Sequence, residues 1–341
     1  MQQQCLLGLD THELSERAAA IGLRPFVGKQ IAQWIYEKRA TAFGQMTNIS
    51  KDGREALDAA YTTGREAPIA CSVSSDGTKK YLFPAGSGST VEAAMIPDGE
   101  RKTLCISTQA GCRMACAFCA TGQQTFRGDL DAAQILNQVL SVEESAELSN
   151  LVFMGMGEPL DNPDALLRTL DALTAPWGLA MSPRRITVST VGREEGLLRF
   201  LHESEAHLAV SLHSPFEVER QELVPASRAL PITRLMGILK SRNWSGQRRL
   251  SFEYVVLGGV NDTDRHMAAL ARLLRGWPCL VNLIAYHPHP DAPFRPPRPG
   301  RMLELRDMLN GQGVRATVRV SRGLDIEAAC GLLARVQGQG R

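Results

Sequence analysis

From about residue 100 onward, short apolar runs alternate with longer helix-like segments, and this alternation restricts the fold more than any other feature of the sequence. Repeated strand–helix units favour a parallel sheet or a barrel with its helices outside. We therefore expect an α/β fold whose ligands gather at the carboxyl ends of the strands. The expected strands are 103–107, 151–155, 185–190, 207–212, 250–256, 280–286 and 315–320, and the helical segments between them include 131–148 and 264–277.

The residues before this repeat have a different character. Apolar side chains at helical spacing, Ile31, Trp34 and Ile35, predict a helical segment near the N-terminus. Short runs broken by Asp-Gly and Gly-Ser follow and predict a small β element. The expected division is a helical accessory domain (1–65), a β element or linker (66–98), an α/β core (99–335) and a frayed tail (336–341).

Composition bounds the class of protein. No apolar run approaches the roughly 20 residues of a membrane span, and the N-terminus lacks the pattern of a signal peptide. We therefore expect a cytoplasmic protein without membrane contact. The net charge of +2 does not by itself indicate nucleic acid binding. In such a chain the eight cysteines indicate metal ligation or catalysis rather than a disulfide framework.

Three of these cysteines, Cys112, Cys116 and Cys119, form a C-x3-C-x2-C array directly after the first expected strand. Clustered thiolates favour a soft metal. A structural zinc site needs a fourth ligand, which the loop does not offer, and small apolar packing is the other alternative. An iron–sulfur cubane held by three thiolates leaves one iron open to a substrate or cofactor. We therefore expect a [4Fe–4S] cluster that takes part in chemistry.

The C-x3-C-x2-C loop and the later Gly-Glu-Pro resemble the signature of the radical S-adenosylmethionine (SAM) enzymes. Other motifs narrow this resemblance to the RlmN/Cfr family of radical SAM RNA adenosine methyltransferases, over roughly residues 20–335. The motifs are "TLCISTQAGCRMACAFCATG", "VFMGMGEPLDN", "RRITVSTVG", "LAVSLHSP", "EYVVLGGVND", "NLIAYHPHPDAPF" and "SRGLDIEAACG". The resemblance implies a partial (β/α)6 radical SAM barrel with a small N-terminal helical domain and a short β extension.

The resemblance also implies the cofactors, the site residues and the reaction. Cys112, Cys116 and Cys119 would hold the cluster, and Cys330 would carry a methyl group taken from one SAM. Cys105 would release the product through a Cys105–Cys330 disulfide, and Glu92 would be the base for the ring proton. The SAM-binding positions would be Gly157, Glu158, Ser189, Ser211, His213 and His287.

The implied substrate is an adenosine in RNA, large-subunit ribosomal RNA first and transfer RNA alongside. Carbon 2 of the ring is preferred, and carbon 8, the antibiotic-resistance branch, is the alternative. A radical SAM enzyme with a non-RNA substrate and a redox-sensing iron–sulfur protein are the other classes considered. An external electron donor such as flavodoxin and a monomeric state are expected.

One stretch departs from the family pattern. His287 stands where the family has an asparagine that contacts SAM, and Ala285 replaces a proline. A histidine ring can still form one such hydrogen bond. Candidate contacts to RNA phosphates are less specific, because basic residues also cover ordinary solvated faces. They are Lys79, Lys80, Arg184, Arg185, Arg248, Arg249, Arg295, Arg298 and Arg301.

Overall fold

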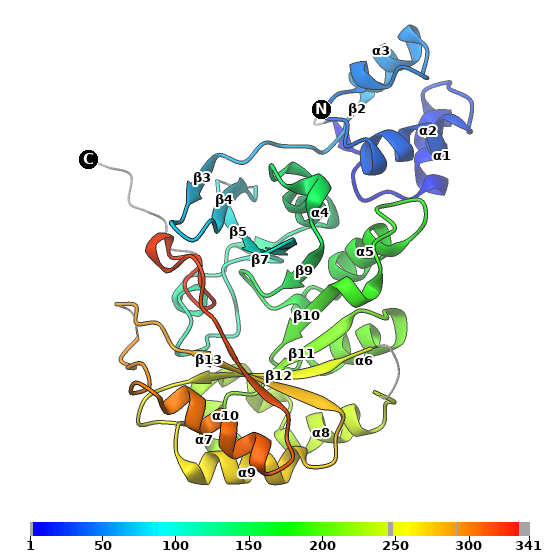
Figure 1. Cartoon of the computed structure of the whole chain (residues 1–341). Coiled ribbons are helices and arrows are strands. Elements are labelled where there is room, and N and C mark those ends of the chain that lie inside the picture. The colour runs from blue at the N-terminus through cyan, green and yellow to red at the C-terminus, as the bar shows by residue number, and fades with distance from the viewer. Residues whose placement is uncertain (1–2, 87, 245–247, 291, 334–341) are drawn as a thin grey trace.

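A computed structural model describes residues 3–86, 88–244, 248–290 and 292–333 of the chain. Its centre is a ten-stranded sheet (Figure 1), in the order β14-β13-β12-β11-β10-β9-β6-β5-β4-β3. From β6 to β14 neighbouring strands run parallel, whereas β3, β4, β5 and β6 pair antiparallel. The strands are β3 (Ala70–Val73), β4 (Lys79–Pro84), β5 (Thr90–Asp98), β6 (Arg101–Cys105), β9 (Asn150–Phe153), β10 (Ile186–Thr190), β11 (His207–Ser211), β12 (Leu250–Val256), β13 (Cys279–Ala285) and β14 (Ala316–Arg319).

The alternation in the sequence therefore predicted the parallel part of the sheet correctly, to within two residues at each strand end. The six βα units implied by the resemblance start at β6 and β9–β13, and β14 adds an edge strand. Helices lie along the outer side of the curved sheet (Figure 1). They are α4 (Ala132–Ser141), α5 (Pro163–Thr174), α6 (Glu194–Glu203), α7 (Glu217–Leu223), α8 (Ile232–Lys240), α9 (Asp264–Leu274) and α10 (Arg301–Gly311).

The helix expected over 131–148 is shorter than predicted. Asp131 caps its start, since the carboxylate accepts a hydrogen bond from the Gln134 amide. It ends at Ser141 because Val142 adopts an extended backbone, and a 3-10 turn follows at Ser145–Glu147. Apolar spacing alone did not reveal this break.

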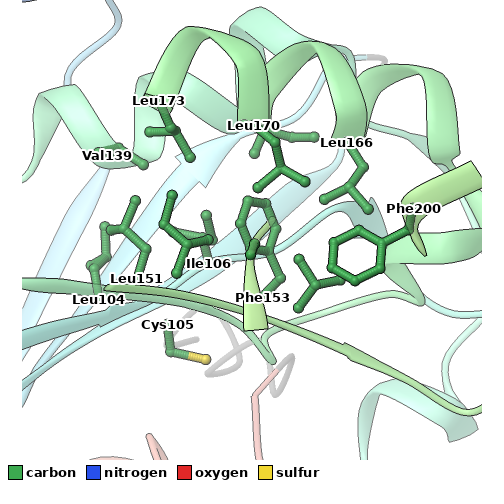
Figure 2. Close-up of a cluster of buried hydrophobic side chains, with 14 of the residues drawn as sticks. Leu104, Cys105, Ile106, Val139, Leu151, Phe153, Leu166, Leu170, Leu173 and Phe200 are labelled. Atoms are coloured by element: carbon green, nitrogen blue, oxygen red, sulfur yellow. The ribbon is translucent and has the colours of Figure 1, made fainter. Parts of the chain in front are cut away.

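Strand alternation separates the packed face of the sheet from its inner face. Leu104, Ile106 and Phe153 point toward the helices and are at most 1% exposed. Figure 2 shows them beneath side chains of α5, with Cys105 pointing to the opposite side of the sheet. Successive strand residues face opposite ways, so the position of Cys105 between two core residues turns its thiol toward the inner face.

The N-terminal part is helical, as predicted. It contains α1 (Thr11–Ala20), α2 (Val27–Ala32), a π-helical turn (Gln33–Glu37) and α3 (Lys51–Ala60), and β1 (Gln4–Cys5) pairs with β2 (Tyr61–Thr62). Ile31 and Ile35 are fully buried and Trp34 packs against them, as the helical spacing indicated.

Contacts that join this helical part to the core include an arginine that donates hydrogen bonds and an aromatic pair. Arg65 donates hydrogen bonds to Ser141 Oγ, at 2.9 Å, and to the Leu140 carbonyl on α4. Tyr36 meets Trp177 edge-on, with ring centroids 5.3 Å apart. No helix among the described residues is long and apolar enough to cross a membrane. The expected tail, 336–341, lies outside the described residues.

Candidate active site

The loop that carries the three cysteines is closed by a short antiparallel strand pair, β7 (Gln109–Ala110) with β8 (Gly128–Asp129). Gly111 turns the chain into the loop with φ 79°, and a Cβ there would lie 2.6 Å from the Thr125 carbonyl oxygen. A side chain therefore cannot occupy this position without moving the backbone. The loop holds its three thiols half-buried along one cavity of about 150 Å³; they belong to Cys112, Cys116 and Cys119.

The donor set of this loop fits an iron–sulfur cluster. Burial raises the pKa of the Cys112 thiol to about 12 and that of Cys116 well above its ordinary value, so both are neutral until a cation replaces their protons. In the described part of the chain no group of three or more His, Cys, Asp or Glu is arranged to hold a single metal ion. In a cubane each thiolate binds a different iron, which suits three sulfurs spaced along a cavity wall.

The Gly-Glu-Pro turn follows β9 and faces the same cavity. The Glu158 carboxylate is buried and accepts hydrogen bonds from the Leu160 amide, at 3.0 Å, and the Val191 amide, at 2.9 Å. Burial nevertheless raises its pKa to about 7. Gly157 has φ 96°, and a Cβ there would lie 2.5 Å from Gln109 Cβ, so only glycine fits. The turn presents a fixed, buried carboxyl group suited to a cationic ligand.

Polar side chains at the ends of β10 and β11 form the next part of the wall. Ser189 Oγ and Ser211 Oγ lie 3.4 Å apart on these neighbouring strands. His213 is buried with a positive φ of 60°, and its Nδ1 accepts a hydrogen bond from the Val255 amide at 3.0 Å. Burial and the nearby Arg220 lower its pKa to about 3. The ring is therefore neutral, with its proton on Nε2 as a donor.

His287 lines this cavity from the other side, at the end of β13. Its Nε2 lies 2.5 Å from Ser321 Oγ, and burial lowers its pKa. Ser321 belongs to the segment that leads from β14 to Cys330. The side chain that departs from the family pattern thus connects the cavity to the loop that carries Cys330.

All positions implied for the cluster and for SAM therefore line one cavity, although they come from five separate segments of the chain. Met154, Ile284 and Cys330 line this cavity and also a second one of about 350 Å³. Cys105 faces the second cavity, so the two expected catalytic cysteines meet there. Cys330 is exposed, whereas Cys105 is buried. Burial, reinforced by the nearby Cys330, raises the pKa of the Cys105 thiol to about 12. Both are free thiols, so the expected disulfide is not present in this structure.

Glu92 lies on the inner face of the sheet but lines neither of these two cavities. Ala94 pairs with Cys105 between β5 and β6, and Glu92, two residues earlier on β5, shares that face. Its carboxylate forms a buried ion pair with Lys80, with a nitrogen–oxygen distance of 3.1 Å. The structure therefore places Glu92 beside the site.

The sequence analysis missed Glu253, which lines the first cavity from the middle of β12 and is 3% exposed. It accepts hydrogen bonds from Asn282 Nδ2, at 2.7 Å, and Ser251 Oγ, at 2.9 Å, and Arg319 Nε lies 3.8 Å from its other oxygen. A carboxylate within an apolar strand was a signal that could have been used, because such a charge is costly without a polar function or partner.

The cations of the second cavity were missed as well; they are Arg101, Arg319 and Arg322. Several of the expected RNA contacts are instead engaged in other pairs. Lys80 pairs with Glu92, Lys79 Nζ lies 2.6 Å from Glu144, and Arg298 and Arg301 share Glu304. Of these expected cations, none lines either cavity.

Comparison with known proteins identifies the family. Residues 106–271 match the radical SAM superfamily, and residues 5–62 match the ribosomal RNA large subunit methyltransferase N-terminal domain. The probable dual-specificity RNA methyltransferase RlmN of Porphyromonas gingivalis is 53% identical over 331 residues, which cover 96% of both chains. This chain belongs to the RlmN family. The dual-specificity RNA methyltransferase RlmN of Solidesulfovibrio magneticus is 40% identical over 343 residues, 98% of each chain.

A solved structure supports the RlmN assignment. The crystal structure of a radical SAM methyltransferase from Sphaerobacter thermophilus superposes with a TM-score of 0.91 at 40% identity, covering 97% of this chain and 99% of that one. The radical SAM fold expected from the motifs is thus confirmed, and so is membership of this family of enzymes.

Proposed function

We propose that this RlmN-family enzyme methylates a ring carbon of adenosine in RNA, carbon 2 of an adenosine in large-subunit ribosomal RNA first, with transfer RNA as a second substrate. The names of its relatives support an RNA methyltransferase of dual specificity. The observation that carries the proposal is the position of Cys330. Cys330 lines both the cavity of the three clustered cysteines and the cavity of Cys105.

In this proposal the first cavity holds the cofactors. Cys112, Cys116 and Cys119 would hold the [4Fe–4S] cluster, which, when bound, would supply the electron that splits SAM into methionine and a 5′-deoxyadenosyl radical. The Glu158 carboxyl group faces the SAM ammonium, and Gly157 lets this turn pack closely against Gln109. Hydroxyl and imidazole donors orient the rest of SAM; they belong to Ser189, Ser211, His213 and His287.

The two remaining cysteines divide the work on the substrate. Cys330 carries the methyl group as S-methylcysteine, because its position between the cavities lets the sulfur meet SAM on one side and the adenine on the other. The 5′-deoxyadenosyl radical would take a hydrogen atom from that methyl group, leaving 5′-deoxyadenosine, and the resulting carbon radical would add to the adenine ring. The adduct would lose one electron to the oxidised cluster and the ring proton to Glu92, which leaves the RNA tethered to Cys330. The Cys105 thiolate attacks the Cys330 sulfur, the carbon–sulfur bond breaks, and its electron pair leaves with the product. The resulting disulfide must be reduced by an external dithiol before the next turnover.

Glu92 accepts the ring proton in this proposal. The Glu92 carboxylate lies 3.1 Å from the buried Lys80 ammonium, and a carboxylate is a residue type that can act as a general base. Because Glu92 lies beside the two cavities, the bound adenine must reach toward β5.

We further propose a monomeric cytoplasmic enzyme served by an external electron donor such as flavodoxin. The division into a helical accessory domain (1–65), a β element (66–98) and a barrel core (99–335) is retained as part of the proposal. The β element continues the sheet of the core, so we expect these two parts to unfold together.

The test is an anaerobic assay with the reconstituted enzyme, methyl-labelled SAM, a reductant, and unmodified ribosomal or transfer RNA. Mass spectrometry of the nucleosides should show labelled 2-methyladenosine, which a Cys330→Ala variant should not produce. Labelled 8-methyladenosine would instead show that the enzyme methylates carbon 8 of the ring. Cleavage of SAM without any RNA product would overturn the RNA substrate.

A further inference from the structure

The cysteine loop rests on a helix that buries an arginine. Arg220, in the last turn of α7, has 0% exposure and is the largest fully buried side chain among the described residues. A buried cation is costly unless a partner compensates its charge, since desolvation opposes the charged form. The position of this arginine therefore needs an explanation.

The guanidinium is only partly satisfied by the protein. Its Nη2 donates to the Val191 carbonyl, at 2.6 Å, and more weakly to the Ser211 carbonyl, at 3.4 Å. Its Nε and Nη1 have no hydrogen-bond partner, and no carboxylate among the described residues forms an ion pair with Arg220. Glu217 attracts it from a distance, but that carboxylate accepts hydrogen bonds from Gln221 and from the Ile232 amide.

Three contacts place this unpaired charge behind the cysteine loop. The Val191 and Ser211 residues that accept its hydrogen bonds line the cavity of the three thiols. The Ala117 amide, directly after Cys116, donates to the Leu223 carbonyl of α7 at 2.9 Å. Val191 and Leu223 pack with Met114 and Phe118 of the loop in one apolar cluster. Arg220 also interacts electrostatically with the Cys116 residue of this loop.

The negative charge of a cluster bound to the three cysteines would supply the missing partner of Arg220. Three thiolates on an oxidised [4Fe–4S] core leave one net negative charge, and one-electron reduction adds a second. We propose that Arg220 is a positioning residue that acts as the counter-charge of the cluster and stabilises its reduced state. The inference rests on the proposed cluster site and adds a group that sets how readily the cluster accepts an electron.

The test is the midpoint potential of the cluster, followed by electron paramagnetic resonance during a redox titration of the reconstituted enzyme. Arg220→Gln keeps a donor for the Val191 carbonyl and removes the charge. We expect its equilibrium constant for reduction to fall at least tenfold, which is about 59 mV toward more negative potential for a one-electron couple. Arg220→Lys, which keeps the charge, should stay within about threefold of the wild type, or about 28 mV.

The direction of the shift separates this role from a merely structural one. A loosened loop would admit water, which stabilises the more highly charged reduced cluster and moves the potential the other way. Arg248→Gln is a control, because Arg248 is a half-buried arginine that also has a lowered pKa but precedes β12, at the opposite end of the strands. It should leave the potential unchanged.

A second readout does not depend on the potential. Cluster binding should raise the melting temperature less in Arg220→Gln than in the wild type, because binding loses one attraction in the variant. Arg220→Met gives both readouts if the glutamine variant does not fold. An unchanged or more positive potential in the uncharged variants would overturn the role of Arg220 but not the proposed cluster site. Wild-type protein that takes up no iron and sulfide overturns the proposed cluster site itself.

Discussion

The Lys80 ammonium lies 3.1 Å from the Glu92 carboxylate, and both residues are at most 7% exposed. They lie on neighbouring strands, where Lys80 pairs with Ala94 and Leu82 pairs with Glu92. The two charges therefore sit diagonally on the inner face of the sheet, within reach of each other's long side chains. Each charge is thus the nearby partner of the other in a buried position.

Breaking this pair should destabilise the protein strongly. Lys80→Met leaves the Glu92 carboxylate without its cation, and Glu92→Gln removes the charge that balances Lys80. We expect each variant to lower the free energy of unfolding by about 3–5 kcal/mol, measured by urea denaturation of the apoprotein. The double variant Lys80→Met with Glu92→Leu should lose much less than the sum, since no buried charge then remains.

Lys51→Met is the control for this cycle. Lys51 Nζ lies 3.8 Å from the Glu55 carboxylate in an exposed i,i+4 pair on α3, so we expect a loss of about 1 kcal/mol or less. Additive losses in the double variant would show that Lys80 and Glu92 do not interact as the geometry indicates.

Variants of the two cysteines proposed to act in catalysis should fail at different steps. Cys105→Ala removes the thiolate that releases the product, so RNA should accumulate covalently attached to the protein. Cys330→Ala removes the attachment point, so no adduct should form. A denaturing gel of the reaction with labelled RNA distinguishes the two, with a protease-sensitive shifted band expected for Cys105→Ala only. Cys279→Ala, which removes another buried thiol, at the start of β13, should behave as the wild type.

If Cys105→Ala gave methylated RNA without an adduct, Cys105 would not be the releasing group. An adduct in Cys330→Ala would move the methyl carrier to another residue. Either result would contradict the assignment drawn from the shared cavity.

The sheet, and the gathering of polar residues along the first cavity, could be predicted from the sequence because both depend on local order. Apolar runs fixed the parallel strands, and polar residues directly after those runs had to meet at one edge of the sheet. Ser189 and Ser211 illustrate this, since Ser211 ends β11, Ser189 is the last residue but one of β10, and their hydroxyls lie 3.4 Å apart. The meeting of Cys105 with Cys330 came from the family resemblance, because no local pattern joins residues so distant in the chain.

The side-chain environments could not be read from the sequence. Lys80 was grouped with surface cations, yet its place opposite Ala94 turns it inward beside Glu92. Arg220 was not noticed, because one arginine in the charged segment "EVERQEL" reads as solvent-facing. Burial of such residues is decided by which helix face meets the cysteine loop, and that contact is tertiary.

His287, which stands where the family has an asparagine, should preserve SAM binding through one hydrogen bond. His287→Asn restores the family's residue, so we expect its dissociation constant for SAM to stay within about threefold of the wild type. His287→Ala removes the bond and should weaken binding about tenfold, as expected for a hydrogen bond worth about 1.4 kcal/mol. Isothermal titration of the reconstituted enzyme measures both.

Ser321→Ala separates the two contacts of His287. This variant removes the hydroxyl 2.5 Å from Nε2 but leaves the ring in the cavity. Binding of SAM close to the wild-type value is expected. Equal losses in Ser321→Ala and His287→Ala would mean that the histidine acts on the Cys330 segment instead of on SAM.

The affinity for SAM should depend on pH through Glu158. Burial raises the pKa of this carboxyl group from 4.5 to about 7. The folded protein without SAM therefore keeps a proton that the unfolded chain releases near pH 4.5, and this group's contribution to stability is lost as the pH rises from about 4.5 to about 7. The SAM ammonium favours the ionised carboxylate, so binding must expel the remaining proton below pH 7.

We therefore expect the dissociation constant for SAM to fall as the pH rises toward about 7, by up to about tenfold per unit well below that value. Titrations between about pH 5.5 and 7.5 stay below the range in which an α-amino group itself titrates, about 7.7–8.0. Glu158→Gln keeps acceptor and shape but cannot ionise, so its weaker binding should show no such dependence. A wild-type profile that stays flat while SAM binds tightly would mean that the ammonium is held by groups other than the Glu158 carboxylate, because the buried proton would then not compete with it.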